Sequence, residues 1–232
     1  PVVAPASSAW KTAIRNIRMS FPNESDAWHL EVRKETFREL GRMSGEFAHM
    51  GKFLARYRSG ELEFKGKEIL VVGGGCGFAP LRSLMYSFFE MSGEFKKLFF
   101  RGGCKNPQEF LYKEELAQWS KRKDLDIELT VDKGDSAWKG RVGVVTVIID
   151  SADMNYKTGI AIICGPPIMM KFATIKLLEM GFKEENTYLS MEKNMSCGLG
   201  KCGHCRLGTY YACKDGPVFR YDKIKKFHDI WD

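Results

Sequence analysis

Residues 68–91 read EILVVGGGCGFAPLRSLMYSFFEM, and this stretch decides the fold. It begins with a short apolar run rich in β-branched residues, which predicts a buried strand. A glycine-rich segment follows and predicts a tight turn; its glycines are Gly73, Gly74, Gly75 and Gly77. Beyond the turn, residues 79–91 place apolar side chains at helical spacing. A strand that passes through such a turn into a helix can offer N–H groups to a pyrophosphate, although many glycine-rich turns are only tight turns.

The chain downstream repeats the alternation of strand and helix. Strands are predicted at 96–103, 126–134, 159–167 and 186–192, and helices at 106–122 and 168–181. Asn106 and Pro107 suit the start of the first of these helices, as N-cap and first helical residue. The rhythm predicts an α/β fold with a parallel sheet covered on both faces, spanning residues 67–192.

The region before residue 67 has a weaker pattern. Residues 27–35 predict a strand, and residues 41–54 predict a short helix behind a Gly-x-x-Ser turn. We treat residues 1–66 as one region of the chain. Residues 193–232 form another, because their many glycines predict a loop-rich segment rather than regular structure.

Four cysteines are clustered in residues 194–214, NMSCGLGKCGHCRLGTYYACK. They are Cys197, Cys202, Cys205 and Cys213, and their spacing is C-x4-C-x2-C-x7-C. This is the plant-type [2Fe–2S] spacing, in which four thiolates ligate two irons. The intervening glycines suit the same interpretation, because residues without a Cβ let backbone N–H groups turn toward a negatively charged cluster.

Three other uses of these thiols are weaker. Structural zinc normally needs two close pairs of ligands and the segment has one, although His204 could serve as a further ligand. Haem attachment needs a histidine directly after Cys205, where Arg206 stands. Disulfides suit a secreted protein, whereas seven cysteines with four in one cluster indicate a reducing compartment, for which we expect the cytoplasm.

Composition and charge limit the class of protein. The chain has 232 residues, 44% of them hydrophobic, which fits a globular protein with a sizeable core. No apolar run is long enough to span a bilayer. The formal net charge is +7, but the basic residues are dispersed and no nucleic-acid-binding motif accompanies them. We therefore expect neither a membrane span nor nucleic acid as a partner.

Basic residues are nevertheless enriched around the cysteines. They are Lys193, Lys201, Arg206, Lys214, Arg220, Lys223, Lys225 and Lys226. Such charges are commonly no more than a solvated face. The alternative is a docking surface for an acidic partner.

Two strand ends carry further candidates. Cys164 lies at the carboxyl end of a predicted strand, at the edge where ligands bind in open α/β sheets. A lone cysteine there is commonly a small buried apolar residue, but beside a nicotinamide ring its polarisable sulfur could pack against the reacting carbon. After the second strand, Arg101 and Lys105 stand where a dinucleotide fold distinguishes the ribose hydroxyl from the 2′-phosphate, which favours NADPH over NADH.

Three motifs in this order resemble one known family. GGGCGFAPLRSL, CGPPIMM, and SCGLGKCGHC followed by CKDGPVF resemble the ferredoxin–NADP reductase superfamily, in its iron–sulfur electron-transfer branch. That branch includes electron-transfer subunits of sulfhydrogenases, anaerobic sulfite reductases and dihydroorotate dehydrogenases. The resemblance runs from about residue 61 to residue 219 and implies three parts: an FAD-binding β-barrel, an NAD(P)-binding α/β domain and a [2Fe–2S] segment.

The resemblance also implies a set of site residues. Those that approach the dinucleotide would be Gly73, Gly74, Gly75, Gly77, Ala79 and Pro80. Cys164, Gly165 and Pro166 would flank the nicotinamide, and the four clustered cysteines would ligate the cluster. Gly41, Arg42 and Ser44 resemble the turn that holds the FAD pyrophosphate. The region before residue 67 is shorter than the family's barrel, so we expect a short or incomplete FAD region.

The expected function is therefore that of an electron-transfer subunit. It would pass electrons between NAD(P)H, FAD and a [2Fe–2S] cluster, to or from a catalytic subunit of hydrogenase or sulfite-reductase type. An acidic ferredoxin is the alternative partner. The alternative function is a non-enzymatic iron–sulfur sensor or assembly module with a degenerate nucleotide-binding fold.

Overall fold

The computed structural model describes residues 14–15, 18–19, 22–31, 59, 63–195, 198 and 200–231. The chain divides into two compact units, residues 1–48 and 49–232. In the first unit residues 26–31 are helical, so the strand expected at 27–35 is wrong there. Ser25 explains the helix, because its hydroxyl accepts the Trp28 N–H at 3.2 Å and so caps the first turn. The helix expected at 41–54, together with Gly41, Arg42 and Ser44, lies outside the described residues.

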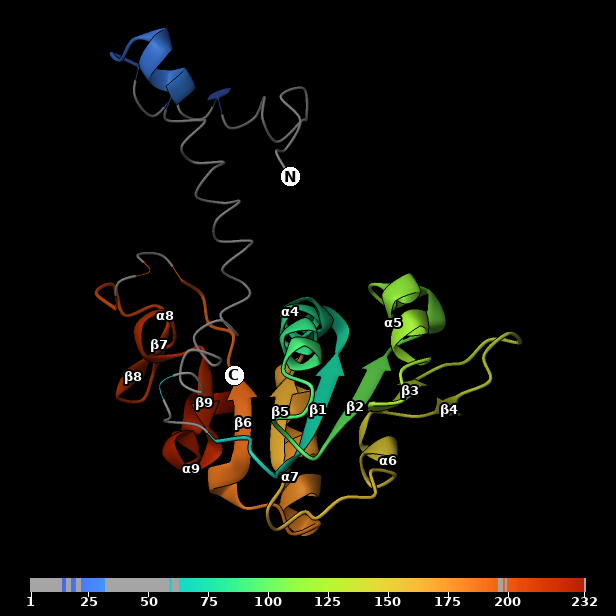
Figure 1. Ribbon diagram of the computed structural model, residues 1–232. Helices are drawn as coiled ribbons and strands as arrows, with labels where there is room; N and C mark the ends of the chain where they lie inside the picture. Colours follow the sequence, from blue (N-terminus) through green and yellow to red (C-terminus); the bar gives the residue numbers. More distant parts are fainter. Residues whose placement is uncertain are drawn as a thin grey trace. The chain divides into compact units, whose positions relative to one another are not determined.

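The second unit is built on a seven-stranded sheet in the order β4-β3-β2-β1-β5-β6-β9 (Figure 1). The strands are β1 (Glu68–Gly74), β2 (Lys97–Cys104), β3 (Leu125–Val131), β4 (Arg141–Val142), β5 (Ile160–Cys164), β6 (Thr187–Ser190) and β9 (Val218–Arg220). All neighbouring pairs are parallel except β6 with β9, which is antiparallel. The predicted parallel sheet is confirmed.

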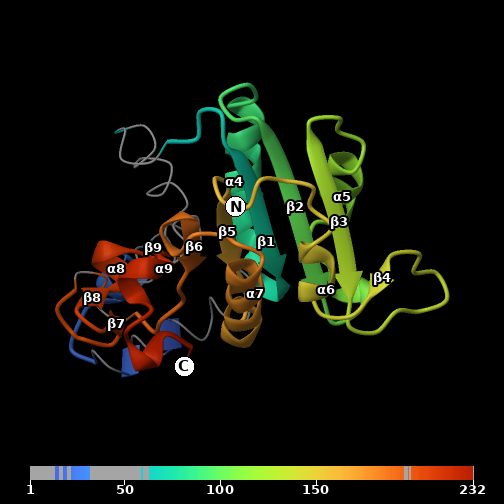
Figure 2. The same cartoon turned by 90° about the horizontal axis from the view of Figure 1, so that it is seen from below.

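Both faces of the sheet are covered (Figure 2). Side chains alternate along β1, where Ile69 and Val71 enter one hydrophobic core and Leu70 and Val72 enter the other. Helices α4 (Phe78–Glu90) and α5 (Lys113–Trp119) contribute to the first core. Helices α6 (Thr146–Ile149) and α7 (Pro167–Glu179) contribute to the second. The near-continuous apolar runs of β1 and β5 follow from this burial on both sides.

The helix predicted at 106–122 is shorter and starts later than expected. Asn106 does act as an N-cap, but it caps the single 3₁₀ turn η2 (Pro107–Glu109), whose two N–H groups its side chain accepts. Tyr112 then adopts a left-handed conformation with φ 57°, and α5 begins only at Lys113. A left-handed residue interrupts helical hydrogen bonding, so the two turns are separate.

The segment after residue 192 is more regular than its glycines suggested. It contains the hairpin β7 (Arg206–Leu207) and β8 (Tyr210–Tyr211), then α8 (Ala212–Asp215), β9, α9 (Tyr221–Ile224) and η4 (His228–Trp231). Buried residues of this segment share the second core with the sheet; they include Cys205, Leu207, Ala212, Cys213 and Phe219. The boundary expected at residue 193 therefore separates two parts of one compact unit.

The remaining short elements are the 3₁₀ turns η1 (Gly75–Gly77) and η3 (Glu184–Asn186). Among the described residues, no helix has both the length and the apolar character required to cross a bilayer.

Candidate functional site

The carboxyl edge of the sheet has one topological switch point. From β1 the chain builds β2, β3 and β4 on one side, then returns to place β5 on the other side of β1. Figure 1 shows the arrowheads of β1, β2 and β6 at the same edge. Open α/β sheets bind ligands at the carboxyl ends of the strands where the strand order reverses. The loops after β1 and β5 meet at that place, and both were singled out by sequence.

The glycine turn after β1 packs directly on the backbone after β5. A Cβ on Gly77 would overlap the carbonyl group of Cys164 and would stand 2.8 Å from the Gly165 Cα. Gly75 has φ 53°, a left-handed conformation that favours glycine. The turn leads into α4, with Gly77 as N-cap and Ala79 exposed in the first turn. These features suit a close approach of the turn by a pyrophosphate.

The segment after β5 is held from the other side by a flexible side chain. Met169 lies so close to Gly165 that a Cβ there would stand 2.6 Å from the Met169 methyl group. The same thioether would overlap a Cβ on Gly74. Pro166 is exposed and precedes the first residue of α7. The structure therefore brings Gly74, Gly77, Gly165 and Pro166 to one edge, as the sequence predicted, although their ligand contacts stay a prediction.

Cys164 is buried at the end of β5. It is 6% exposed, and burial raises the pKa of its thiol to about 12, so the thiol is neutral at physiological pH. Ser190, at the end of β6, hydrogen-bonds this thiol. The register explains the contact, because Ile163 pairs with Leu189 and the next residues lie side by side. Sequence reasoning missed Ser190; its place at the end of a predicted strand was the available signal.

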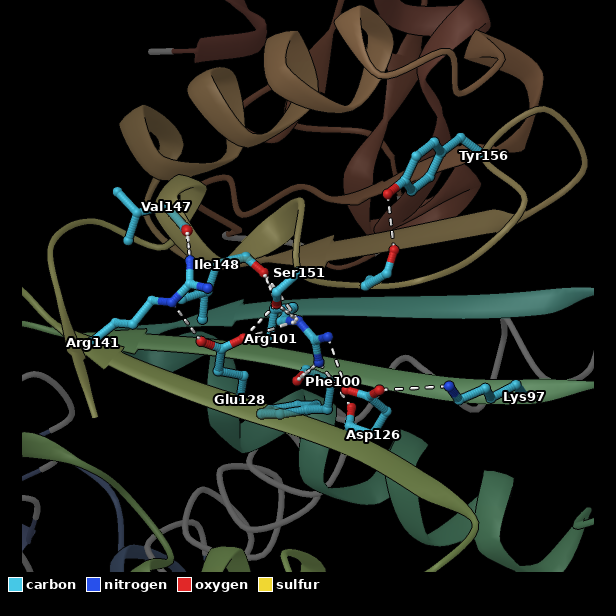
Figure 3. A network of polar contacts seen from close by, with 11 residues as sticks. Lys97, Phe100, Arg101, Asp126, Glu128, Arg141, Val147, Ile148, Ser151 and Tyr156 are labelled. Carbon is cyan, nitrogen blue, oxygen red and sulfur yellow. Dashed lines mark hydrogen bonds and ion pairs between the residues drawn. The ribbon is translucent and has the colours of Figure 1, made fainter. Parts of the chain in front are cut away.

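Arg101 does not face this edge, which corrects the expected 2′-phosphate contact. It lies inside β2, is 1% exposed, and shares its face of the sheet with the second core (Figure 3). Its guanidinium forms an ion pair with Asp126 at 2.8 Å and donates to the Ile148 carbonyl at 3.0 Å. A buried, fully engaged guanidinium cannot turn to a ligand beyond the strand end. Lys105 remains, exposed directly after β2.

The surroundings of Arg101 form a network of polar contacts between several elements (Figure 3). Arg101 Nε also donates to the Ser151 hydroxyl at 3.0 Å, and Ser151 in turn hydrogen-bonds Glu128. Glu128 forms an ion pair with Arg141 at 3.1 Å, and Asp126 is 3.6 Å from the Lys97 ammonium. The network connects β2, β3, β4 and α6 with Ser151, which indicates a structural role.

The C-x7-C spacing of the cysteine segment corresponds to the hairpin. Cys205 precedes β7 and Cys213 follows β8, with Gly208 in the turn at φ 57°. Folding back brings the two sulfurs to 3.1 Å from each other, and both side chains are buried. The Gly200 N–H donates to the Cys213 sulfur at 3.1 Å. Sequence reasoning predicted that these residues meet but did not foresee the hairpin that does it.

The donor set fits an iron–sulfur cluster. Two thiolates 3.1 Å apart would repel strongly, so a cation that binds both stabilises the pair. Soft thiolate ligands select iron–sulfur clusters, zinc or Cu(I). Cys202 is exposed, and Cys197 lies outside the described residues. Within the described part of the chain, no three metal-ligating side chains converge on one point, so the full ligand set stays a prediction.

The basic residues around the cysteines are not equivalent. Arg220 forms an ion pair with Asp222 at 2.8 Å, and Lys225 forms one with Glu184 at 2.7 Å. Lys193 donates to the Asp229 carbonyl at 2.7 Å. Arg206 and Lys214 are exposed and flank the buried cysteines along the chain. Among these basic residues, Arg220 and Lys225 therefore have their charge offset by a nearby carboxylate.

Two protein-family models match the chain. The oxidoreductase NAD-binding domain matches residues 71–174, which begin in β1 and end in α7. The iron–sulfur cluster binding domain of dihydroorotate dehydrogenase B matches residues 192–225. The two matches cover the glycine turn, the loop after β5 and all four clustered cysteines.

Several known proteins are similar in sequence. The gamma subunit of sulfhydrogenase 2 of Pyrococcus furiosus is 33% identical over 174 residues, which are 68% of this chain and 60% of that protein. A probable dihydroorotate dehydrogenase B (NAD(+)) electron transfer subunit of Thermococcus kodakarensis is 34% identical, over 69% of this chain and 61% of that protein. The chain thus spans about three fifths of the length of these relatives.

Solved structures include one that is similar over part of the chain. It is the cytochrome b5 reductase domain of Ulva prolifera nitrate reductase, with a TM-score of 0.48 and 25% identity. The alignment covers 53% of this chain and 48% of that chain.

Sequence motifs, sheet topology and family models agree on the type of protein. The predicted α/β fold and the position of the iron–sulfur segment after the NAD-binding part are confirmed. The chain belongs to the ferredoxin–NADP reductase superfamily, in the branch whose NAD-binding domain is followed by an iron–sulfur domain of the dihydroorotate dehydrogenase B type.

Proposed function

We propose that this chain is an electron-transfer subunit that works between NAD(P)H, FAD and a [2Fe–2S] cluster. One observation carries the proposal. Cys205 and Cys213 share a hydrophobic core with Val72 and Ile163, the residues that immediately precede the nucleotide edge in β1 and β5. The thiols and the nucleotide edge are therefore parts of one packed body, which is what transfer between two bound redox centres needs.

The nucleotide end would bind and orient the dinucleotide. The turn from Gly73 to Gly77 and the first turn of α4, with Ala79 and Pro80, would hold the pyrophosphate by backbone N–H groups. Cys164, Gly165 and Pro166 would lie beside the nicotinamide. The Cys164 thiol keeps its proton, because its pKa is raised to about 12, so it serves as an apolar contact and moves no proton.

The cysteine end would hold the cluster. Cys205 and Cys213 supply two buried thiolates, and the Gly200 N–H points at the second sulfur and offsets its negative charge. Cys202 and Cys197 complete the proposed set. When bound, the flavin and the cluster supply the conversion between the electron pair of a hydride and single electrons. We place FAD with Gly41, Arg42 and Ser44 on family resemblance.

A catalytic partner follows from the same proposal. The named relatives are subunits of a sulfhydrogenase and of dihydroorotate dehydrogenase B, so we propose that this chain also serves a larger redox complex. Seven cysteines with four in one cluster favour a reducing compartment, so we also propose that the chain works in the cytoplasm. A stable subunit would co-elute with its partners at high salt, whereas an acidic ferredoxin bound by charge would dissociate.

The proposal can be tested on the full chain prepared without oxygen. Iron, sulfide, zinc and flavin are quantified, and NADPH or NADH is added while the visible spectrum is recorded. Loss of both flavin and cluster absorbance, with a paramagnetic [2Fe–2S] signal, would support it. Zinc without iron would contradict the cluster assignment. An intact cluster that neither nicotinamide cofactor reduces, in a chain that binds no flavin, would favour the non-enzymatic sensor.

A further inference from the structure

The end of β2 holds a buried thiol that the proposed function leaves unused. Cys104 is the last residue of β2 and is 7% exposed within the first core. Its neighbour Gly103 pairs with Gly74, so the thiol lies one strand away from the glycine turn. The two turns that follow β1 and β2 therefore start side by side.

The Cys104 thiol hydrogen-bonds both turns. Its sulfur accepts the N–H of Gly75, the residue with φ 53° in the turn after β1. Its S–H donates to the Glu109 carbonyl, with the sulfur 3.8 Å from that oxygen. Burial, the largest cause, raises the pKa of the thiol to about 11, so it keeps its proton at neutral pH and can donate while it accepts.

The turn after β2 is itself closed by hydrogen bonds. The Asn106 side chain accepts the N–H groups of Gln108 and Glu109 and donates to the Glu109 carboxylate at 2.7 Å. Lys105 lies between this turn and Cys104, exposed at the edge of the sheet. The thiol of Cys104 thus hydrogen-bonds Gly75 in the glycine turn and Glu109 in the turn that follows Lys105.

We infer that Cys104 is a positioning residue for the dinucleotide, because it fixes the spacing between the glycine turn and the turn of residues 105–109. The inference rests on the proposed binding of NAD(P)H at this edge. A dinucleotide fold holds the pyrophosphate at its first turn and the adenosine ribose after its second strand. One ligand therefore touches both turns. If the spacing between the two turns varies in the free protein, binding must fix it, and the cost of this ordering lowers the affinity.

The test compares Cys104→Ala with Cys104→Ser in the full chain. Dissociation constants for NADPH, NADH and reduced nicotinamide mononucleotide are measured by calorimetry. We expect Cys104→Ala to weaken both dinucleotides about three- to tenfold, the range for losing such hydrogen bonds. The mononucleotide lacks the adenosine half, so its affinity should not change. Serine can accept from Gly75 and donate to Glu109, so Cys104→Ser should restore dinucleotide affinity.

Three results would overturn the inference: unchanged dinucleotide affinity in Cys104→Ala, an equal loss for the mononucleotide, or a loss that serine does not restore. The second would indicate general loosening of the domain, and the third would indicate a cavity effect. If the unsubstituted chain binds none of the three ligands, the proposed function fails first and takes the inference with it.

Discussion

Arg101 and Lys105 stand four positions apart in the sequence and have different surroundings. Arg101 is enclosed by the side chains of Asp126 and Ser151 and by three backbone carbonyls, whereas Lys105 is exposed at the edge of the sheet. The end of β2 produces the difference, because Arg101 lies within the strand, between neighbouring strands, and Lys105 lies past its end. We therefore predict that any selectivity for the 2′-phosphate at this place depends on Lys105.

Substitution of these two residues should separate stability from selectivity. Arg101→Ala leaves Asp126 and Glu128 without their shared cation, and we expect it to lower the free energy of unfolding by about 2–4 kcal/mol, since both acids are partly exposed. Lys105→Ala should leave stability unchanged and weaken NADPH about tenfold with little effect on NADH. Chemical denaturation and calorimetric titration measure the two effects. An NADPH preference abolished by Arg101→Ala alone would contradict this assignment.

The buried cysteines offer a second test at this scale. Cys213→Ser should remove most of the iron, because it replaces a sulfur that lies 3.1 Å from Cys205 and accepts the Gly200 N–H. Cys104→Ser is the matched control, a buried thiol replaced in the same way at the end of β2, and should keep its iron. Iron analysis and visible absorbance of the two purified variants measure the difference. Equal iron content in the two variants would remove Cys213 from the ligand set.

At the scale of elements, the candidate nucleotide site is formed where the turn after β1 contacts the segment after β5. The turn after β1 and the segment after β5 touch through backbone atoms at Gly77, whereas a Cβ on Gly74 would meet the thioether of the Met169 side chain. Backbone cannot move aside as a flexible thioether can, so these glycines should tolerate substitution differently.

Alanine substitutions at Gly77 and Gly74 test this difference in tolerance. Gly77→Ala should destabilise the protein by about 1–3 kcal/mol, because its Cβ would overlap the Cys164 carbonyl, and should weaken NADH binding. Gly74→Ala should cost less in both respects, because Met169 can adopt another rotamer. Thermal unfolding and NADH titration of the paired variants provide the comparison. The reverse order of effects would show that the contact at Gly77 does not limit the turn.

The elements also show how far sequence reasoning reaches. The positions of β1, β2, β3, β5, β6, α4 and α7 followed from apolar runs and glycine turns, whereas α5 starts later than expected and β4 and α6 were not predicted. The edge that joins Gly77 to Gly165 followed from parallel topology. The pairing of Arg101 with Asp126 did not follow, because it depends on the register of β2 with β3, a contact between residues distant in sequence. The β7–β8 hairpin was missed because strands of two residues carry no periodic pattern.

At the scale of the whole second unit, the cysteine segment is part of the hydrophobic core. Cys205 and Cys213 are buried with residues of β1, β5 and α7, and β9 extends the main sheet beside β6. A metal centre held by these thiols would therefore support packing in addition to the electron transfer that we propose. Removal of the metal centre should therefore destabilise the nucleotide-binding part as well.

Removal of the cluster should lower the thermal stability of that whole unit. We expect the Tm to fall by about 5 °C or more, roughly 2 kcal/mol at this size, since anything bound only by the folded state stabilises it. Calorimetry of the protein before and after iron chelation measures the change. Cys213→Ser should lose the same amount and show no further response to the chelator. An unchanged Tm would mean that the core forms without its metal.

The antiparallel pairing of β9 with β6 limits how the iron–sulfur segment can be separated from the NAD-binding part. Ser190 pairs with Val218 and Leu189 with Phe219, so residues from beyond the cysteines occupy what would otherwise be a bare sheet margin. A chain truncated after Glu192 would expose β6 as an edge strand, together with the apolar side chains that β9 covers. Exposed edge strands pair with strands of other molecules. Such a fragment should self-associate. We therefore expect that the iron–sulfur segment cannot be transferred to another protein by itself. A chimeric protein should receive this segment together with β6.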